Sequence, residues 1–296
     1  MSLAQRVLAI PDCPVHSARV RATLHAVQDS LPEAGRFPLA YLVQSGAQLA
    51  LVLKTAAMPA TDWLDGRLKQ RLQAAGVEGL WLHLHPAVGK KIFNKPGWHL
   101  LWGAARSRDA QGFVYGPASF RQPIADLYRQ ALAQTENFLQ PSPGTLVIDL
   151  YSGNGNTLRR WAAAGAAAIG VELNAQACDC ARLNGPLSEI LRGTCAQRIP
   201  QLEQWSEQPR YAARTRLLYL NPPRTGLEAP LCDWISNRYR PARIAYLSCS
   251  AGTLQRDMAL LCGAGYRVEH IFPYDFFPHT YHVETLSLLS LRDARV

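Results

Sequence analysis

The chain has 296 residues, enough for two ordinary domains, and 48% of them are hydrophobic, enough to fill sizeable cores. It contains no run of about 18 apolar residues, which excludes a membrane-spanning helix, and its first residues lack the features of a signal peptide. The formal net charge of +9 suits a polyanionic partner, and seven cysteines without a Cys-x-x-Cys pair favour reduced thiols in the cytoplasm.

The pattern of residues 1–115 predicts a small α+β domain. A Ser-Gly pair inside an apolar stretch indicates a hairpin, and Thr61 is the expected N-cap of an amphipathic helix. His83 and His85 fall on the polar face of an alternating strand, where solvated histidines are expected rather than metal ligands. The expected elements are the hairpin, the helix and two further strands, at residues 39–54, 61–76, 79–85 and 98–103.

Positive charge is concentrated in this first part of the chain. Residues 1–115 hold 13 Lys and Arg against 7 Asp and Glu, whereas residues 116–296 hold 18 against 15. The stretch GKKIFNKPGWHLLWG places Lys90 and Lys91 among aromatic side chains. Basic residues interleaved with aromatic ones suit phosphates and stacked bases. A solvated turn between strands explains the stretch equally well, so both interpretations stay open.

A second domain is expected over residues 116–296, where a helix at 124–139 precedes a series of apolar runs. Continuous apolar strands separated by helices indicate an α/β fold with a doubly wound, parallel sheet. The last two runs are joined by too little chain for a crossover helix, so the final strand is expected to be antiparallel. The runs lie at residues 145–150, 168–173, 216–221, 243–248, 266–274 and 284–291.

A glycine-containing turn, DLYSGNGNTL, follows the first of these strands and leads into a helix. Gly153 and Gly155 permit a tight turn and a close backbone approach to a ligand. The dinucleotide fingerprint is incomplete, because Leu158 stands at its third glycine position. Glu172 ends the next strand, where a carboxylate can bind both hydroxyls of a ribose. The pattern favours a nucleoside cofactor over an ordinary strand–turn–helix with a capping acid.

Three later stretches carry rigid or reactive groups. NPPRTGL begins with Asn221 at a strand end, and its two prolines fix an extended backbone that lacks two amide donors. Cys249, in YLSCSAGTLQRD, lies where a strand should end and a helix begin, which suits either a core residue at the rim or a nucleophile. Glu284 ends FPHTYHVE and starts the last strand.

These motifs, in this order and spacing, resemble those of the RNA uracil-C5 methyltransferases, which form 5-methyluridine in tRNA and rRNA. The likeness runs from PASFRQP nearly to the C-terminus. It implies a class I methyltransferase fold with a seven-stranded sheet, S-adenosyl-L-methionine as cofactor and RNA as partner. It makes Cys249 the nucleophile that adds to C6 of uracil and Glu284 the base that removes the C5 proton. A cytoplasmic monomer without a membrane or metal site is expected.

By the same resemblance, further residues fall on binding positions. Arg224 is expected at the substrate, although a structural ion pair would suit it equally, and the remaining cysteines are expected to be buried fillers. The expected cofactor-binding residues are Gln122, Tyr151, Gly153, Asn156, Glu172 and Asn221. The expected substrate-binding residues are Asn221, Arg224, Lys90 and Lys91.

The chain departs from the family pattern in several places. Asn221 stands where many members have Asp, and Ser250 replaces the usual Asn after the nucleophile. Thr194 lies near the position of an acid that faces the adenine amino group, which leaves adenine recognition open. PDCPVH resembles the last cysteine motif of an iron–sulfur site, but Cys13 alone holds no cluster. A naturally short member and a truncated one are both compatible with this pattern.

Two other functions compete with this interpretation. Asn-Pro-Pro followed by an aromatic residue marks amino-group methyltransferases, but Arg224 stands in the aromatic residue's place. Cys249 and Glu284 would also have no role in such an enzyme. A catalytically impaired relative with the same fold would bind RNA without turning over the cofactor.

Overall fold

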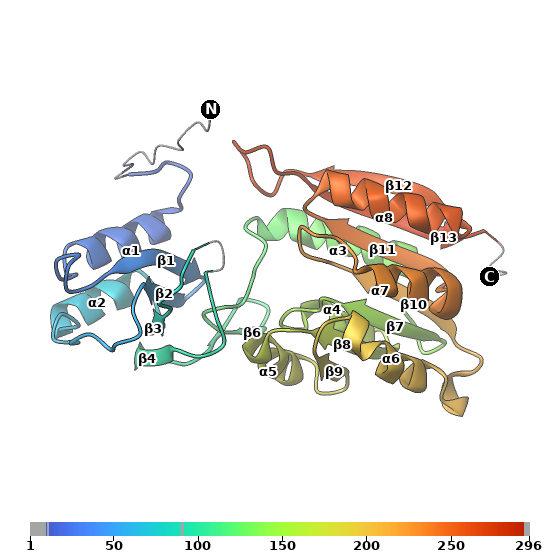
Figure 1. Ribbon diagram of the computed structural model, residues 1–296, viewed down its shortest axis with the longest axis horizontal. Helices are drawn as coiled ribbons and strands as arrows, with labels where there is room; N and C mark the ends of the chain where they lie inside the picture. Colours follow the sequence, from blue (N-terminus) through green and yellow to red (C-terminus); the bar gives the residue numbers. More distant parts are fainter. Residues whose placement is uncertain (1–9, 11, 90–91, 293–296) are drawn as a thin grey trace. The chain divides into compact units, whose positions relative to one another are not determined.

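A computed structural model describes residues 10, 12–89 and 92–292, so Lys90 and Lys91 lie outside the described residues (Figure 1). The chain divides into two compact units, Met1–Asp109 with Gly116–Ala118 and Ala110–Tyr115 with Ser119–Val296. The boundary expected at residue 115 falls in the stretch where the chain changes from one unit to the other. No helix in the described ranges is long and apolar enough to cross a membrane.

The first unit contains a four-stranded sheet with two helices on one face (Figure 1). Its elements are α1 (Ala18–Gln28), β1 (Leu39–Ser45), β2 (Gln48–Leu53), α2 (Gly66–Ala74), β3 (Gly79–Leu84), β4 (Trp98–Gly103) and β5 (Ser107–Arg108). The order is β1-β2-β3-β4, with β2 and β3 parallel and the two outer pairs antiparallel. Alternating leucines of β2 and β3 pack against apolar residues of both helices and form the core of this unit.

The helix expected to start at Thr61 begins later, at Gly66. Asp65 is its N-cap, and the Asp65 carboxylate accepts a hydrogen bond from the Leu68 amide (2.7 Å). Aspartate is a stronger N-cap than threonine, because its carboxylate satisfies an otherwise unpaired amide with a full charge. The expectation that Thr61 caps this helix is therefore wrong.

The expectation that His83 and His85 are solvated is also wrong, since both residues are buried (0% and 6% exposed). The ring centroid of His83 lies 4.2 Å from that of Trp98 and 5.6 Å from that of Phe93. Its Nε2 accepts a hydrogen bond from the Asn94 amide (3.1 Å). Burial lowers the pKa of His83 to about 4, so the ring is neutral. The segment before β4 thus covers the face that strand alternation assigned to solvent.

The second unit is an α/β structure built on a seven-stranded sheet. Its elements are β6 (Val114–Tyr115), α3 (Ala125–Leu139), β7 (Thr145–Leu150), α4 (Asn156–Ala163), β8 (Ala167–Glu172), α5 (Ala175–Asn184), β9 (Glu189–Arg192), η1 (Ala196–Arg198), α6 (Ile199–Ser206), η2 (Pro209–Tyr211), β10 (Thr215–Leu220), α7 (Ala229–Trp234), η3 (Ile235–Tyr239), β11 (Arg243–Ser248), α8 (Ala251–Gly263), β12 (Tyr266–Tyr274) and β13 (Glu284–Leu291). The strand order is β12-β13-β11-β10-β7-β8-β9 (Figure 1). Strands β7 to β11 are parallel, and β13 is antiparallel to both of its neighbours. The doubly wound fold and the antiparallel last strand are confirmed.

Apolar side chains cover both faces of this sheet. Leu139 of α3 and Trp161 of α4 pack on one face, whereas Trp205 of α6, Trp234 of α7 and Leu261 of α8 pack on the other. Because β7, β8, β10 and β11 run in the same direction, their carboxyl ends lie at one edge of the sheet. The antiparallel β13 begins at that edge. Strand ends that are distant in sequence therefore meet there.

Candidate active site

Five of the expected site residues lie at this carboxyl edge of the sheet. They are Tyr151 after β7, Glu172 at the end of β8, Asn221 after β10, Cys249 after β11 and Glu284 at the start of β13. Each residue comes from a different strand. The topology of the sheet, rather than proximity in sequence, places them at one edge.

The turn between β7 and α4 uses left-handed backbone, with φ of 62° at Tyr151, 54° at Gly153 and 76° at Gly155. A Cβ on Gly155 would lie 2.9 Å from the Cα of Ala181 in α5, so helix packing requires this glycine. A Cβ on Gly153 would meet nothing within 4 Å, so the backbone there faces space that a ligand can occupy. Of the two expected glycines, only Gly153 has the surroundings of a ligand contact.

The Glu172 carboxylate is fixed beside this turn. Its Oε2 accepts a hydrogen bond from the Gly153 amide (3.0 Å), and its Oε1 accepts one from the Asn174 amide (2.7 Å). Each carboxylate oxygen retains a second lone pair, so Glu172 can still accept from two ribose hydroxyls. The buried Oδ1 of Asn156, at the start of α4, has no hydrogen-bond partner in the described part of the chain. These groups fit the ribose end of a nucleoside cofactor.

Tyr151 and Asn221 are neighbours at this edge, because the register of β7 and β10 pairs Leu150 with Leu220. The Asn221 amide donates to the Leu150 carbonyl (3.3 Å) and continues that ladder. The Tyr151 side chain packs against the core that α6, α7 and α8 cover. Burial raises the pKa of the Tyr151 phenol, which is therefore neutral. Asn221 stays half-buried at the rim, where its side chain can reach a ligand.

The loop after β9 contains no acid of its own. The Thr194 hydroxyl accepts a hydrogen bond from the Gln197 amide (3.2 Å) and closes the turn before η1. The Glu228 carboxylate reaches this loop from the residue before α7, and its Oε2 accepts from the Ala196 amide (2.8 Å). A carboxylate is thus present near Thr194, although the sequence pattern gave no sign of it.

Cys249, the first residue after β11, and Glu284, the first residue of β13, come at facing positions. β11 and β13 pair with Ser248 opposite Thr285, and continuing this register by one residue sets Cys249 opposite Glu284. Side chains at directly opposite positions have Cβ atoms about 5 Å apart. A thiol and a carboxylate at this spacing can act on adjacent atoms of one planar ring.

Burial decides how this pair is protonated. Glu284 is 3% exposed, and burial raises its pKa to about 7, while Gln122 and Arg224 act in the opposite direction. Burial and the nearby Glu284 carboxylate raise the pKa of the Cys249 thiol, whereas Arg224 lowers it. Glu284 can therefore exchange a proton near neutral pH, as a general base must. The Cys249 thiolate depends on the positive charge of Arg224.

Two further expected residues lie close to this pair. Both polar atoms of the Gln122 amide are buried and complete no well-aligned hydrogen bond within the described ranges, although the amide lies near enough to lower the pKa of Glu284. The Arg224 guanidinium contacts a histidine ring rather than a carboxylate, since its Nη2 donates to Nε2 of His282 (3.0 Å). Within the part of the chain that the structure describes, Arg224 forms no ion pair with a carboxylate at salt-bridge distance.

The remaining cysteines take no part in this arrangement. Four of the expected fillers are buried, whereas Cys13 and Cys262 are half-buried, so the expectation fails for these two. The buried four are Cys178, Cys180, Cys195 and Cys232. Among the described residues, no group of three or more His, Cys, Asp or Glu side chains could hold a metal ion.

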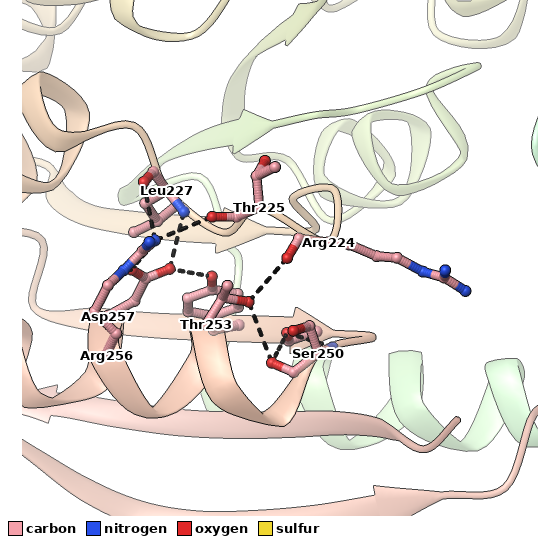
Figure 2. A network of polar contacts seen from close by, with 9 residues as sticks. Arg224, Thr225, Leu227, Ser250, Thr253, Arg256 and Asp257 are labelled. Atoms are coloured by element: carbon pink, nitrogen blue, oxygen red, sulfur yellow. Dashed lines mark hydrogen bonds and ion pairs between the residues drawn. The ribbon is translucent and has the colours of Figure 1, made fainter. Parts of the chain in front are cut away.

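Sequence reasoning missed the contacts that hold the loop carrying Arg224. Thr253, Arg256 and Asp257 lie on one face of α8 and hydrogen-bond to the backbone of residues 224–227 (Figure 2). Their spacing of three and four residues places them on one helix face, and this spacing was the available signal.

Three comparisons relate the chain to known methyltransferases. The family model for tRNA (Uracil-5-)-methyltransferase matches residues 207–292. An uncharacterised RNA methyltransferase of Thermosynechococcus vestitus is 29% identical over 313 residues, which cover 97% of this chain and 66% of that protein. The 23S rRNA (uracil(747)-C(5))-methyltransferase RlmC of Edwardsiella ictaluri is 28% identical over 298 residues, which cover 94% of this chain and 76% of that protein.

A solved structure shares the fold. The tRNA (uracil-54, C5)-methyltransferase of Pyrococcus abyssi, in complex with S-adenosyl-L-homocysteine, superposes with a TM-score of 0.68 at 22% identity. The match covers 96% of this chain and 70% of that one. The present chain thus spans just under two thirds of the length of the Thermosynechococcus relative and somewhat more of the other two.

Proposed function

We propose that the chain is a member of the RNA uracil-C5 methyltransferase family and that it transfers a methyl group from S-adenosyl-L-methionine to C5 of a uridine in RNA. The observation that carries this proposal is the facing pair of Cys249 and Glu284. C5 of uracil is a poor nucleophile until a thiolate has added to C6. After methylation, the proton on C5 must be removed. Methylation of an amino group would need neither side chain.

The proposed reaction forms and breaks one bond to Cys249. The thiolate adds to C6, and the electron pair of the C5–C6 double bond moves into an enolate, which makes C5 nucleophilic. The cofactor supplies an electrophilic methyl group. The Glu284 carboxylate then takes the C5 proton, the double bond forms again, and the C6–S bond breaks to return the thiolate.

Neighbouring side chains support these two groups. Burial raises the pKa of the Cys249 thiol, and the positive charge of Arg224 opposes this rise and so favours the attacking thiolate. The buried amide of Gln122 lacks a well-aligned partner among the described residues, which suits a group that binds the target base or the cofactor. We assign Asn221 to the same task, because its half-buried side chain lies at the rim.

Nucleoside analysis tests the proposed function directly. The protein is incubated with S-adenosyl-L-methionine and RNA from cells that lack it, and the digested RNA is analysed by mass spectrometry. We expect 5-methyluridine to appear only when protein and cofactor are both present. A methylated amino group in place of 5-methyluridine would overturn the proposal in favour of an amino-group enzyme. RNA binding without any methylation would identify an impaired relative.

Glu172→Ala is expected to weaken S-adenosyl-L-methionine binding by about 1–3 kcal/mol, the scale of losing hydrogen bonds to a charged group. Calorimetry measures this loss. Glu207→Ala, which removes an exposed carboxylate after α6, is the control and should bind like the wild type. Equal affinity of Glu172→Ala and wild type, or no binding by the wild type, would remove Glu172 from the cofactor site.

We further propose that residues 1–115 bind the RNA backbone, as their excess of basic residues suggests. Reversing the charges of Lys90 and Lys91 to Glu should weaken RNA binding at low salt. It should also reduce the slope of log affinity against log salt by about 2. Reversing Arg67 and Lys69 of α2 is the matched control for net charge. If both double variants bind RNA alike, the stretch around Lys90 is a solvated turn.

We also propose that the protein acts in the cytoplasm as a monomer. A reducing compartment keeps the Cys249 thiol available for attack. A single chain supplies every residue assigned here to the reaction, from Gln122 to Glu284. Equilibrium sedimentation at assay concentrations tests the monomer.

A further inference from the structure

Side chains of α8 hold the loop that carries Arg224 (Figure 2). The Thr253 hydroxyl donates to the Arg224 carbonyl (3.2 Å). Nη2 of Arg256 donates to the Thr225 carbonyl (3.1 Å) and to the Leu227 carbonyl (3.2 Å). The backbone of this loop is therefore hydrogen-bonded to one helix at three residues, Arg224, Thr225 and Leu227.

Asp257 is the buried centre of this network, with 1% of its side chain exposed. Its Oδ2 accepts from the Leu227 amide (2.8 Å) and the Tyr246 hydroxyl (2.7 Å), and its Oδ1 accepts from Arg256 (2.7 Å). A Cβ on Gly226 would lie 2.5 Å from Asp257 Oδ2, so the loop fits against this carboxylate only with glycine there. A buried carboxylate with three donors, one of them cationic, is a rigid anchor.

The same helix begins next to the proposed nucleophile. α8 starts at Ala251, shortly after Cys249, and the Thr253 hydroxyl also lies 3.3 Å from the Ser250 carbonyl. The Thr253 hydroxyl is thus within hydrogen-bond distance of one carbonyl in the Arg224 loop and one at the start of α8. The Arg224 side chain points away from the network (Figure 2), and its charge acts on the Cys249 thiol. Contacts made by α8 therefore set the position of Arg224 relative to Cys249.

We propose that Thr253, Arg256 and Asp257 form a clamp that holds the Arg224 loop against the start of α8 and keeps the Arg224 guanidinium beside the Cys249 thiol. The inference rests on the proposed function, in which Cys249 is the nucleophile. The three clamp residues touch neither the substrate nor the reacting atoms, so they are positioning residues. Loosening the clamp should reduce thiolate formation and lower kcat, with little change in the KM for RNA.

The alkylation rate of Cys249 in the free, full-length protein tests the clamp. Thr253→Val keeps the side-chain size but removes the hydroxyl, and should slow alkylation by iodoacetamide near neutral pH. The expected factor is about three to ten, the scale of one lost hydrogen bond. The midpoint of the pH–rate profile should also rise, because the thiolate loses part of its cationic support. Peptide mass spectrometry reports the modification of each cysteine separately.

Matched variants control this measurement. Thr253→Ser retains the hydroxyl and should restore the wild-type rate and pH profile. Cys262 lies near the end of the same helix and is half-buried, so its alkylation rate should stay constant in all variants. Arg256→Gln should reproduce the effect of Thr253→Val. Because the Arg256 side chain is half-exposed, the protein should fold normally with this substitution. Unchanged alkylation of Cys249 in these variants would overturn the clamp. Faster alkylation would overturn it too, because it would mean that the substitutions only loosen the fold and expose the thiol.

Methylation assays separate the clamp from the proposed function. If the wild type methylates uridine, Thr253→Val should lower kcat by about three to ten times and keep the KM for RNA within about twofold of wild type. A rise in KM at unchanged kcat would overturn the clamp, because the loop would then only bind RNA. If the wild type methylates nothing while Thr253→Val still slows alkylation, the proposed function fails and the clamp stands.

Discussion

Cys249→Ala and Glu284→Gln are expected to stop methylation at different points. Without the thiolate the uracil ring is never activated, so Cys249→Ala should lose turnover by a factor on the order of 10⁴ or more and form no covalent adduct. Glu284→Gln keeps the thiol and the shape of the side chain but loses the proton acceptor. It should stall with methylated RNA attached to Cys249, with turnover reduced by about 10²–10⁴-fold.

A denaturing gel with radiolabelled RNA distinguishes these outcomes. Glu284→Gln should retain RNA on the protein band, and Cys249→Ala should not. RNA containing 5-fluorouridine should trap even the wild type in a cofactor-dependent band, because fluorine cannot leave as a proton does. Cys262→Ala is the control and should behave like the wild type. A band from Cys249→Ala would reveal another nucleophile, and a wild type that methylates uridine without trapping fluorinated RNA would exclude the covalent route.

The central strands of the second unit were predictable because they are buried on both faces. Such strands read as continuous apolar runs, and β7 and β11 have the predicted bounds. β9 was missed because Glu189–Arg192 is short and at most half-buried, which leaves no apolar run to detect. The count of seven strands followed from the family resemblance rather than from any single run.

Features that depend on distant parts of the chain were not predictable from local patterns. Alternation put His83 on a polar face, but it could not show that Phe93 and Trp98 cover that face. The motifs and the family resemblance indicated that Cys249 and Glu284 act on the same base. Their facing positions depend on the register of β11 and β13, and a slip of one residue would turn one side chain to the opposite face.

The clamp shows the same limit. Asp257 and the Leu227 amide that it accepts from are 30 residues apart, so neither segment alone reveals the contact. Gly226 reads as an ordinary turn glycine in the sequence. The need for glycine at this position becomes clear only when α8 is packed against the loop, because the Asp257 carboxylate then occupies the space that a Cβ would fill.

Glu284→Gln is also expected to stabilise the protein at pH 8. Burial raises the pKa of Glu284 to about 7 in the folded state, against 4.5 for an ordinary glutamate. Between these two values the folded chain binds more protons than the unfolded chain, so its stability falls as pH rises. Above pH 7 the buried charge costs about 3 kcal/mol. Glutamine has the same shape without the charge, so the melting temperature should rise by roughly 5–10 °C.

Melting curves at two pH values test this cost of a buried general base. Below pH 4.5 Glu284 is protonated in both states, so the gain from Glu284→Gln should vanish. Glu269→Gln is the control, because its pKa is shifted in the opposite direction to that of Glu284. The Ser290 hydroxyl and Arg267 lower the pKa of Glu269. That variant should gain no stability at pH 8. Equal melting temperatures for wild type and Glu284→Gln at pH 8 would mean that the buried carboxylate ionises without penalty. A base with so low a pKa would hold the C5 proton too weakly to drive release of the thiol.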